Sequence, residues 1–257
     1  MLDQYYSKKP KKGGTPLLSC SVSEKLPFNV IESSELLAWR AETFWTKEPE
    51  TIAWIKHHVT AQKFVSHFVD IGANVGMYSL FAATLNENIR VISVEPALNN
   101  INVLRENIEL NELTNRINIE INPLSDEEGQ LFLVTDDLRP GASGAQLVDQ
   151  KSVNSVEVNA VTGDSLITKH LVKDGILKID IDGDEFKVLK GFKESLQNGL
   201  IRTILVECTN SNLESIKTFL FAMGYKEDLS FENIAGHSRL RRTANNKIEI
   251  NRIFIKN

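Results

Sequence analysis

Two groups of residues in this chain have the types and spacing that binding and catalysis require. The first lies in the stretch FVDIGANVG (residues 68–76), where an apolar run ends in Asp70 and two glycines, Gly72 and Gly76. Such a run is typical of a buried strand, and glycine after it allows a sharp turn against which a ligand can lie, because no Cβ intervenes. We therefore expect this loop, with Asn74, to bind a ligand.

A further acid, Glu95, ends the next apolar run, VISVE, 25 residues after Asp70. In nucleotide-binding sheets an acid about 20 residues beyond the glycine loop accepts hydrogen bonds from ribose hydroxyls. A dinucleotide loop has a glycine where this chain has Asn74, and a phosphate-binding loop needs Gly-Lys where Gly76-Met77 stands. S-adenosylmethionine carries no pyrophosphate, so its loop tolerates Asn74. The pattern favours that ligand and leaves a nicotinamide-dependent oxidoreductase as the alternative enzyme.

The second group lies in LKIDIDGDEFKVLKG (residues 177–191), where Lys178, Asp180 and Asp182 alternate with apolar residues. On a strand these three share one face, and because burying unpaired charge is costly we expect that face to open on the ligand cleft. Glu207 ends the next strand and is expected at the same crevice. Carboxylates can orient a reacting group and accept its proton, so these four residues are the catalytic candidates.

Two other roles for these charged residues stay open. Lys178 could simply pair with Asp180 or Glu185 at a helix start. The acids Asp180, Asp182 and Glu207 could together hold a divalent metal, since oxygen ligands suit Mg²⁺ or Ca²⁺. We assign no metal ligand.

The elements that position these residues begin near Ala61, where strand-like and helix-like segments alternate. This alternation predicts a mostly parallel sheet with helices on both faces, and a hairpin excursion over residues 129–161. The stretch RPGASG (residues 139–144) is a substrate loop or a hairpin turn. The helix after the second strand is expected to bury Leu98, Ile101, Leu104 and Ile108.

Residues 1–60 have a different pattern and are expected to form an appendage to a ligand-binding domain over residues 61–257. Residues 1–16 are rich in Lys, Pro and Gly without periodicity, which indicates a loose basic arm. The stretch Ser33–Val59 has helical periodicity and is expected to cap the larger domain, with His57 and His58 on its surface.

Composition limits the classes of partner. The chain has 257 residues and a formal charge of −5, so it lacks the overall positive charge that nucleic-acid binding uses. Cys20 and Cys208 fit no disulfide framework or zinc spacing, which favours a cytoplasmic protein. No run of about 18 apolar residues and no export leader is found, so no membrane span is expected. A small-molecule or glycan acceptor fits these limits, and the oligomeric state is left open.

The sequence resembles the FkbM-type methyltransferases. The residues that carry the resemblance are VDIGANVGMYS (69–79), VISVEPALNNINVLRENIELN (91–111), PLSDEEG (123–129), LKIDIDGDEFKVLKG (177–191) and ILVECT (204–209). They occur in family order from about Glu48 to the end of the chain. The resemblance implies a class I methyltransferase fold, an α/β, Rossmann-like architecture with a seven-stranded, mostly parallel sheet whose last strand is antiparallel. It also implies S-adenosylmethionine as the methyl donor and O-methylation of a hydroxyl.

Carried over by position, the resemblance places Asp70, Gly72 and Gly76 at the methionine end of the donor and Glu95 at its ribose. It places Asn122, at the end of the third strand, near the adenine.

The chain departs from the family pattern twice: Pro123 stands where alanine is usual, and Asp182 where glutamate is more frequent. A base methyltransferase of nucleic acids is disfavoured, because IDIDGDE replaces the Asn- or Asp-Pro-Pro-aromatic sequence of that class. A non-catalytic nucleoside-binding module, which would recruit a partner through its amino-terminal helices, remains the alternative outside enzymes.

Overall fold

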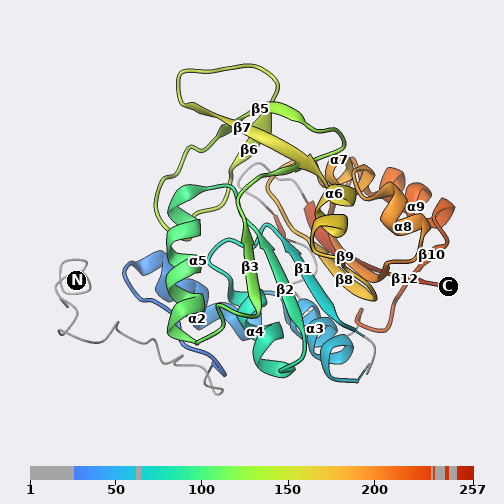
Figure 1. Ribbon diagram of the computed structural model, residues 1–257, viewed down its shortest axis with the longest axis horizontal. Coiled ribbons are helices and arrows are strands. Elements are labelled where there is room, and N and C mark those ends of the chain that lie inside the picture. Colours follow the sequence, from blue (N-terminus) through green and yellow to red (C-terminus); the bar gives the residue numbers. More distant parts are fainter. Residues whose placement is uncertain (1–25, 62–64, 233, 235–240, 243–247) are drawn as a thin grey trace.

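The computed structural model describes residues 26–61, 65–232, 234, 241–242 and 248–257 (Figure 1). The predicted basic arm and Cys20 lie outside the described residues.

The main sheet is mixed and mostly parallel. In spatial order its strands are β10 (Tyr225–Glu227), β12 (Ile248–Lys256), β9 (Ile201–Thr209), β8 (Gly175–Ile179), β1 (His67–Ile71), β2 (Arg90–Val94) and β3 (Ile117–Glu120), with the short β11 (Arg241–Arg242) paired to β12. Neighbours from β9 to β3 are parallel, whereas β12 runs antiparallel to both β9 and β10. This is the order and direction expected of a class I methyltransferase fold, so that prediction is confirmed.

Helices cover both faces of this sheet (Figure 1). The core on one face includes residues of α2 (Glu35–Lys47), α3 (Pro49–Ala61), α4 (Met77–Leu85) and α5 (Leu98–Leu110). The core on the other face includes residues of α6 (Gly163–Lys169), α7 (Glu185–Lys190), α8 (Lys193–Gln197) and α9 (Leu213–Ala222). In β1, Phe68 belongs to the first core and Val69 to the second. Burial on both faces explains why the strand is an almost continuous apolar run in the sequence.

A second, smaller sheet carries the predicted hairpin excursion. Its strands, in spatial order, are β4 (Leu124–Ser125), β7 (Ser155–Thr162), β5 (Gly129–Val134) and β6 (Gln146–Val148). The β5–β7 and β5–β6 pairs are antiparallel. This sheet stands above the main sheet in Figure 1, beyond the carboxyl ends of β1 and β2. The long connection between β5 and β6 therefore lies close to where a ligand binds in such folds.

The helical cap is tied to the strands at the far end of the sequence. The indole Nε1 of Trp54, in α3, donates to Thr203 Oγ1 at 3.1 Å, and that hydroxyl donates to the carbonyl of Phe254 at 2.8 Å. Asn251 Nδ2 donates to Glu50 Oε1 at 3.0 Å. The cap and the sheet thus share buried polar contacts as well as a common core.

Three local expectations are wrong. Leu98 is 68% exposed, because it is the first residue of α5 and lies outside the buried stripe of that helix. His58 is 1% exposed, because α3 turns it toward Trp54 and Phe231. The third strand ends at Glu120, before Asn122.

Candidate active site

A cavity of about 500 Å³ opens at the carboxyl ends of the parallel strands. Its walls come from α2, the β1–α4 loop, the residue after β2, the β5–β6 connection and the segment after β8. Among the predicted site residues, those that line it are Gly72, Asn74, Glu95, Asp180, Asp182 and Glu207. Those that do not are Asp70, Gly76, Asn122 and Lys178.

The two glycines of the first loop are required for packing between protein segments. Gly72 has φ +80°, and a Cβ there would overlap the carbonyl oxygen of Asp180 and lie 2.9 Å from its carbonyl carbon. Gly76 has φ +86°, and its Cβ would overlap Cδ1 of Leu104 in α5. Glycine is needed at both positions because of the left-handed backbone and the close neighbour. Gly72 also lines the cavity, so the expected close approach of a ligand stays a prediction for Gly72 alone.

Asn74 and Glu95 are joined at the floor of the cavity. Asn74 has φ 51°, a conformation that asparagine tolerates well. Its backbone N–H donates to Glu95 Oε2 at 2.9 Å. Glu95 Oε1 accepts from the backbone N–H of Ala97 at 3.0 Å and from Asn100 Nδ2 at 3.4 Å. Burial raises the pKa of Glu95, although these hydrogen bonds act to lower it.

Asp70 lies behind the loop and does not face the cavity. It accepts a hydrogen bond from Ser79 Oγ at 2.7 Å, and its Oδ1 is 3.4 Å from Lys178 Nζ. Ser93 Oγ in turn donates to Ser79 Oγ at 2.7 Å. The carboxylate therefore joins β1 to α4 and β8 and, through Ser79, to β2, and it does not line the cavity at which the resemblance places it.

Lys178 is 1% exposed and lies between two carboxylates. Its Nζ is 3.2 Å from Asp180 Oδ2 and 3.4 Å from Asp70 Oδ1, and it stands over the ring of Tyr78. Burial acts to lower the pKa of Lys178, but the charges of Asp180 and Asp70 outweigh it and raise that pKa. Of the two partners predicted for Lys178 as an alternative, Asp180 does pair with it, whereas Asp70 takes the place of Glu185. Lys178 holds Asp180 in place and does not line the large cavity.

Asp180 and Asp182 lie beyond β8, which ends at Ile179. The expected face shared by three polar residues of one strand is therefore wrong. Asp182 Oδ2 accepts the backbone N–H of Gly144 at 2.6 Å. Glu207, inside β9, is buried and lines the cavity. In the part of the chain that the structure describes, no group of three His, Cys, Asp or Glu side chains could hold a metal ion, so the three acids are not assembled as the metal site considered above.

Asn122, which the resemblance places near the adenine, is not part of the cavity wall. It follows β3 by two residues. Pro123, Leu124 and Ser125 line the cavity there. Pro123, which stands where the family usually has alanine, is therefore itself a residue of the cavity wall.

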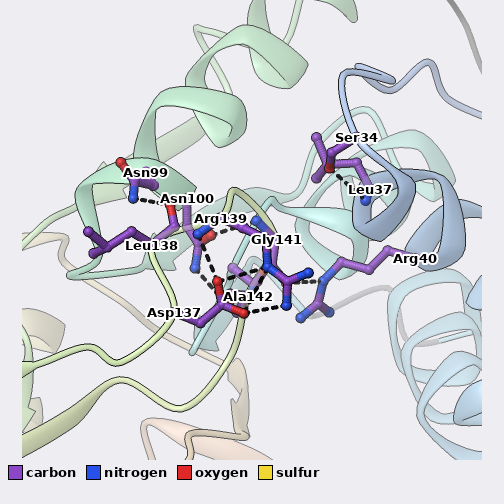
Figure 2. A network of polar contacts seen from close by, with 11 residues as sticks. Ser34, Leu37, Arg40, Asn99, Asn100, Asp137, Leu138, Arg139, Gly141 and Ala142 are labelled. Carbon is purple, nitrogen blue, oxygen red and sulfur yellow. Dashed lines mark hydrogen bonds and ion pairs between the residues drawn. The ribbon is translucent and has the colours of Figure 1, made fainter. Parts of the chain in front are cut away.

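Sequence reasoning missed three residues that shape the site. Trp39 and Arg40 of the cap helix α2 line the cavity, as does Asn100 of α5. Arg40 Nε donates to the carbonyl of Gly141 at 2.6 Å, and burial lowers the pKa of this guanidinium (Figure 2). The only sequence feature that pointed to this part of the wall is the stretch RPGASG, which the sequence predicts as a substrate loop or a hairpin turn. Its residues Ala142 to Gly144 line the cavity.

Comparison with known proteins gives a family match over residues 70–227, to the methyltransferase FkbM domain. The protein "Methyltransferase sdnD" of Sordaria araneosa is 27% identical over 168 residues, which are 54% of this chain and 64% of that protein. The chain therefore spans less than two thirds of that relative. "Methyltransferase 1" of Beauveria bassiana is 24% identical over 181 residues, with 62% of this chain and 72% of that protein covered.

Among solved structures, a methyltransferase from Agrobacterium tumefaciens described as dependent on S-adenosylmethionine is similar with a TM-score of 0.49 and 12% identity, covering 96% of this chain and 71% of that one. Precorrin-6y C5,15-methyltransferase from Geobacter metallireducens gives a TM-score of 0.45 and 12% identity, covering 80% and 87%. Within the described residues no helix is both long and apolar enough to span a bilayer.

Proposed function

Because this chain belongs to the FkbM methyltransferase family, we propose that it transfers the methyl group of S-adenosylmethionine to a hydroxyl of a small molecule or glycan. The observation that carries the proposal is a single cavity lined both by Glu95 and by the carboxylates of Asp180 and Glu207. The first suits a ribose and the second suits a hydroxyl that must lose a proton.

The cofactor end of the cavity fits an adenosine ligand. A volume of about 500 Å³ is in the range of sites for small ligands. An ionised carboxylate offers about four acceptor positions. Three of these acceptor positions of Glu95 take hydrogen bonds from Asn74, Ala97 and Asn100. The carboxylate can therefore still accept a hydrogen bond from a ribose hydroxyl. S-adenosylmethionine, when bound, supplies a methyl group on a cationic sulfur.

The charged residues proposed to act on the acceptor have different roles. Asp180 and Glu207 orient the acceptor hydroxyl and accept its proton. Lys178 positions the Asp180 carboxylate from behind, and Asp182 holds the backbone at Gly144, so both act through other groups. Trp39, which is 45% exposed at the cavity wall, gives an apolar surface for the acceptor ring or chain.

The two alternatives from the sequence are less well supported. An enzyme that binds NAD needs space for a pyrophosphate over the first loop, where the Asn74 side chain reaches across to the carbonyl of Ala142. A non-catalytic nucleoside-binding module would have no use for Asp180 and Glu207 in the same cavity.

The test is calorimetric titration of S-adenosylmethionine, S-adenosylhomocysteine and NAD into the wild type and Glu95→Ala. Loss of the ribose hydrogen bonds is expected to cost about 1.5 to 3 kcal/mol for the two adenosyl ligands. This corresponds to a roughly tenfold to hundredfold weaker affinity. Asp149→Asn is the control, because Asp149 is a carboxylate of the same cavity at its exposed rim.

Unchanged affinity in Glu95→Ala, with a melting temperature like that of the wild type, would remove Glu95 from the cofactor site. Tight binding of NAD and none of S-adenosylmethionine would overturn the proposal as a whole. Labelled methyl transfer to sugar and small-molecule alcohols, compared with matched amines, tests the O-methylation. Transfer to the amines alone would contradict it.

A further inference from the structure

The loop of residues 137–144, here called the clasp loop, is fixed by side chains from four separate parts of the fold. Arg40 of α2 donates to the carbonyl of Gly141, and Asn99 of α5 donates to that of Leu138 (Figure 2). Asn100 and Asn74 hold the middle of the loop, and Asp182 accepts from Gly144. Backbone that would otherwise be free to move is thus held against the cavity.

Asn100 makes the most connections to this loop. Its Oδ1 accepts the backbone N–H of Gly141 at 2.8 Å, and its Nδ2 donates to the carbonyl of Ala142 at 3.1 Å. The same Nδ2 lies 3.4 Å from Glu95 Oε1. The side chain is buried, so water cannot readily replace these hydrogen bonds of its amide group when they are lost.

A second bridge joins the same two groups. The backbone N–H of Asn74 donates to Glu95 Oε2 at 2.9 Å, while its Nδ2 donates to the carbonyl of Ala142 at 2.8 Å. The Glu95 carboxylate and the Ala142 carbonyl are therefore linked twice, once through each asparagine. A ligand that fixes the carboxylate fixes both amides and, through them, the clasp loop.

The loop passes this restraint to the acceptor end. Ala142 and Gly144 line the cavity, and the backbone N–H of Gly144 donates to Asp182 Oδ2 at 2.6 Å. Asp182 lies two residues after Asp180, which is proposed to contact the acceptor. The path from Glu95 to the acceptor side thus consists of contiguous hydrogen bonds and one short segment of backbone.

We propose that Asn100 is a positioning residue that couples occupancy of the ribose site at Glu95 to the clasp loop, so that the bound cofactor sets the acceptor side of the cavity. The inference rests on the proposed function, because it takes Glu95 as the ribose ligand. It predicts that the acceptor binds more tightly to the cofactor-loaded enzyme than to the free one. Allosteric couplings of this kind typically change affinity by about fivefold to 150-fold.

The chain offers a matched control in the neighbouring residue. Asn99 also lies at the start of α5 and also donates its Nδ2 to a carbonyl of the clasp loop, that of Leu138. No hydrogen bond between Asn99 and Glu95 is found among the described residues. Asn99→Ala therefore removes an anchor of the loop without touching the proposed link to the ribose site.

The experiment is hydrogen–deuterium exchange with and without saturating S-adenosylhomocysteine, read on peptides that cover residues 137–145. In the wild type and in Asn99→Ala, the ligand should slow exchange of the Gly141 and Gly144 amides by about fivefold or more. In Asn100→Ala this ligand-dependent slowing should be clearly smaller than in Asn99→Ala, because only the bridge through Asn74 remains, although the variant still binds S-adenosylhomocysteine in calorimetry.

Asn100→Asp is the second variant. It keeps an acceptor for the Gly141 N–H but replaces the donor that faces Glu95 and Ala142. It should therefore keep the anchor at Gly141 and show a response to ligand as small as that of Asn100→Ala. A response in Asn100→Ala or Asn100→Asp as large as that in Asn99→Ala, or no response in a wild type that binds the ligand, would overturn the coupling. A wild type that does not bind S-adenosylhomocysteine would instead refute the proposed function.

Discussion

Substitution of Gly72 by alanine tests why the first loop needs glycine. At φ +80°, a Cβ would overlap the Asp180 carbonyl oxygen and lie 2.9 Å from its carbon and 3.1 Å from Cγ2 of Ile181. Asp180 cannot simply move away, because its backbone N–H donates to the carbonyl of Ile71 at 3.1 Å. The overlap is therefore with backbone that the sheet holds in place.

The expected cost has two parts. A residue other than glycine in a left-handed conformation costs about 1 to 3 kcal/mol. Overpacking against fixed neighbours adds about 1 to 3 kcal/mol. Substitution of Gly144 distinguishes the cost of the backbone conformation from the cost of overpacking. Gly144 has φ +98°, but a Cβ there would meet nothing within 4 Å. Gly144→Ala should show the first cost alone.

Thermal unfolding of both variants measures the difference. For a chain of this size, 1 kcal/mol shifts the melting temperature by about 2 to 4 °C, so Gly72→Ala should melt about 2 to 12 °C below Gly144→Ala. It should also bind S-adenosylhomocysteine more weakly than Gly144→Ala, because both glycines line the cavity but only the Cβ at position 72 would displace Asp180 in the cavity wall. Equal melting temperatures for the two variants would refute the argument from overlap with Asp180.

Two further substitutions test the buried charges. Lys178→Met should lower the free energy of unfolding by about 3 to 5 kcal/mol, since it removes the cation that Asp70 and Asp180 share. Chemical denaturation should show part of this loss recovered when Asp70→Asn is added. Wild-type stability of the single variant would contradict the ion-pair assignment. Burial raises the pKa of Glu185 from its ordinary 4.5 to about 8. Between these values the folded state keeps a proton that the unfolded chain has released, so the free energy of unfolding should fall as pH rises through this window. Glu185→Gln should remove most of that fall, and parallel melting-temperature curves against pH for the two proteins would contradict it.

Local pattern was sufficient to predict the strands that bear the site. Apolar runs located β1, β2, β8 and β9, and their ends placed Glu95 and Glu207 at one cavity because the carboxyl ends of parallel strands meet. The same pattern could not show which way a side chain points near the end of a strand. Asp70 was expected to reach the ligand but turns toward Ser79 and Lys178.

The missed residues depend on contacts between distant segments. Arg40 reaches Gly141 across 101 residues, and Asn100 reaches it across 41. The local sequence of α2 does not show whether its arginine lies in a cavity wall or on a solvent-exposed face of the helix. His58 was misplaced for the same reason, because Phe231, which contacts it, comes far later in the chain.

The pairing of the cap with the late strands has a consequence for how the protein is made. The hydrogen bond of Trp54 can form only after Thr203 has been synthesised, and that of Glu50 only after Asn251 has been synthesised. At about 5 to 20 residues per second, a ribosome needs roughly 10 to 40 s to add the intervening 200 residues. Until then the part of α3 that packs on β9 and β12 lacks its partner, although β1 and α4, which also contact α3, are already made. That exposed part makes the nascent chain a candidate for chaperone binding.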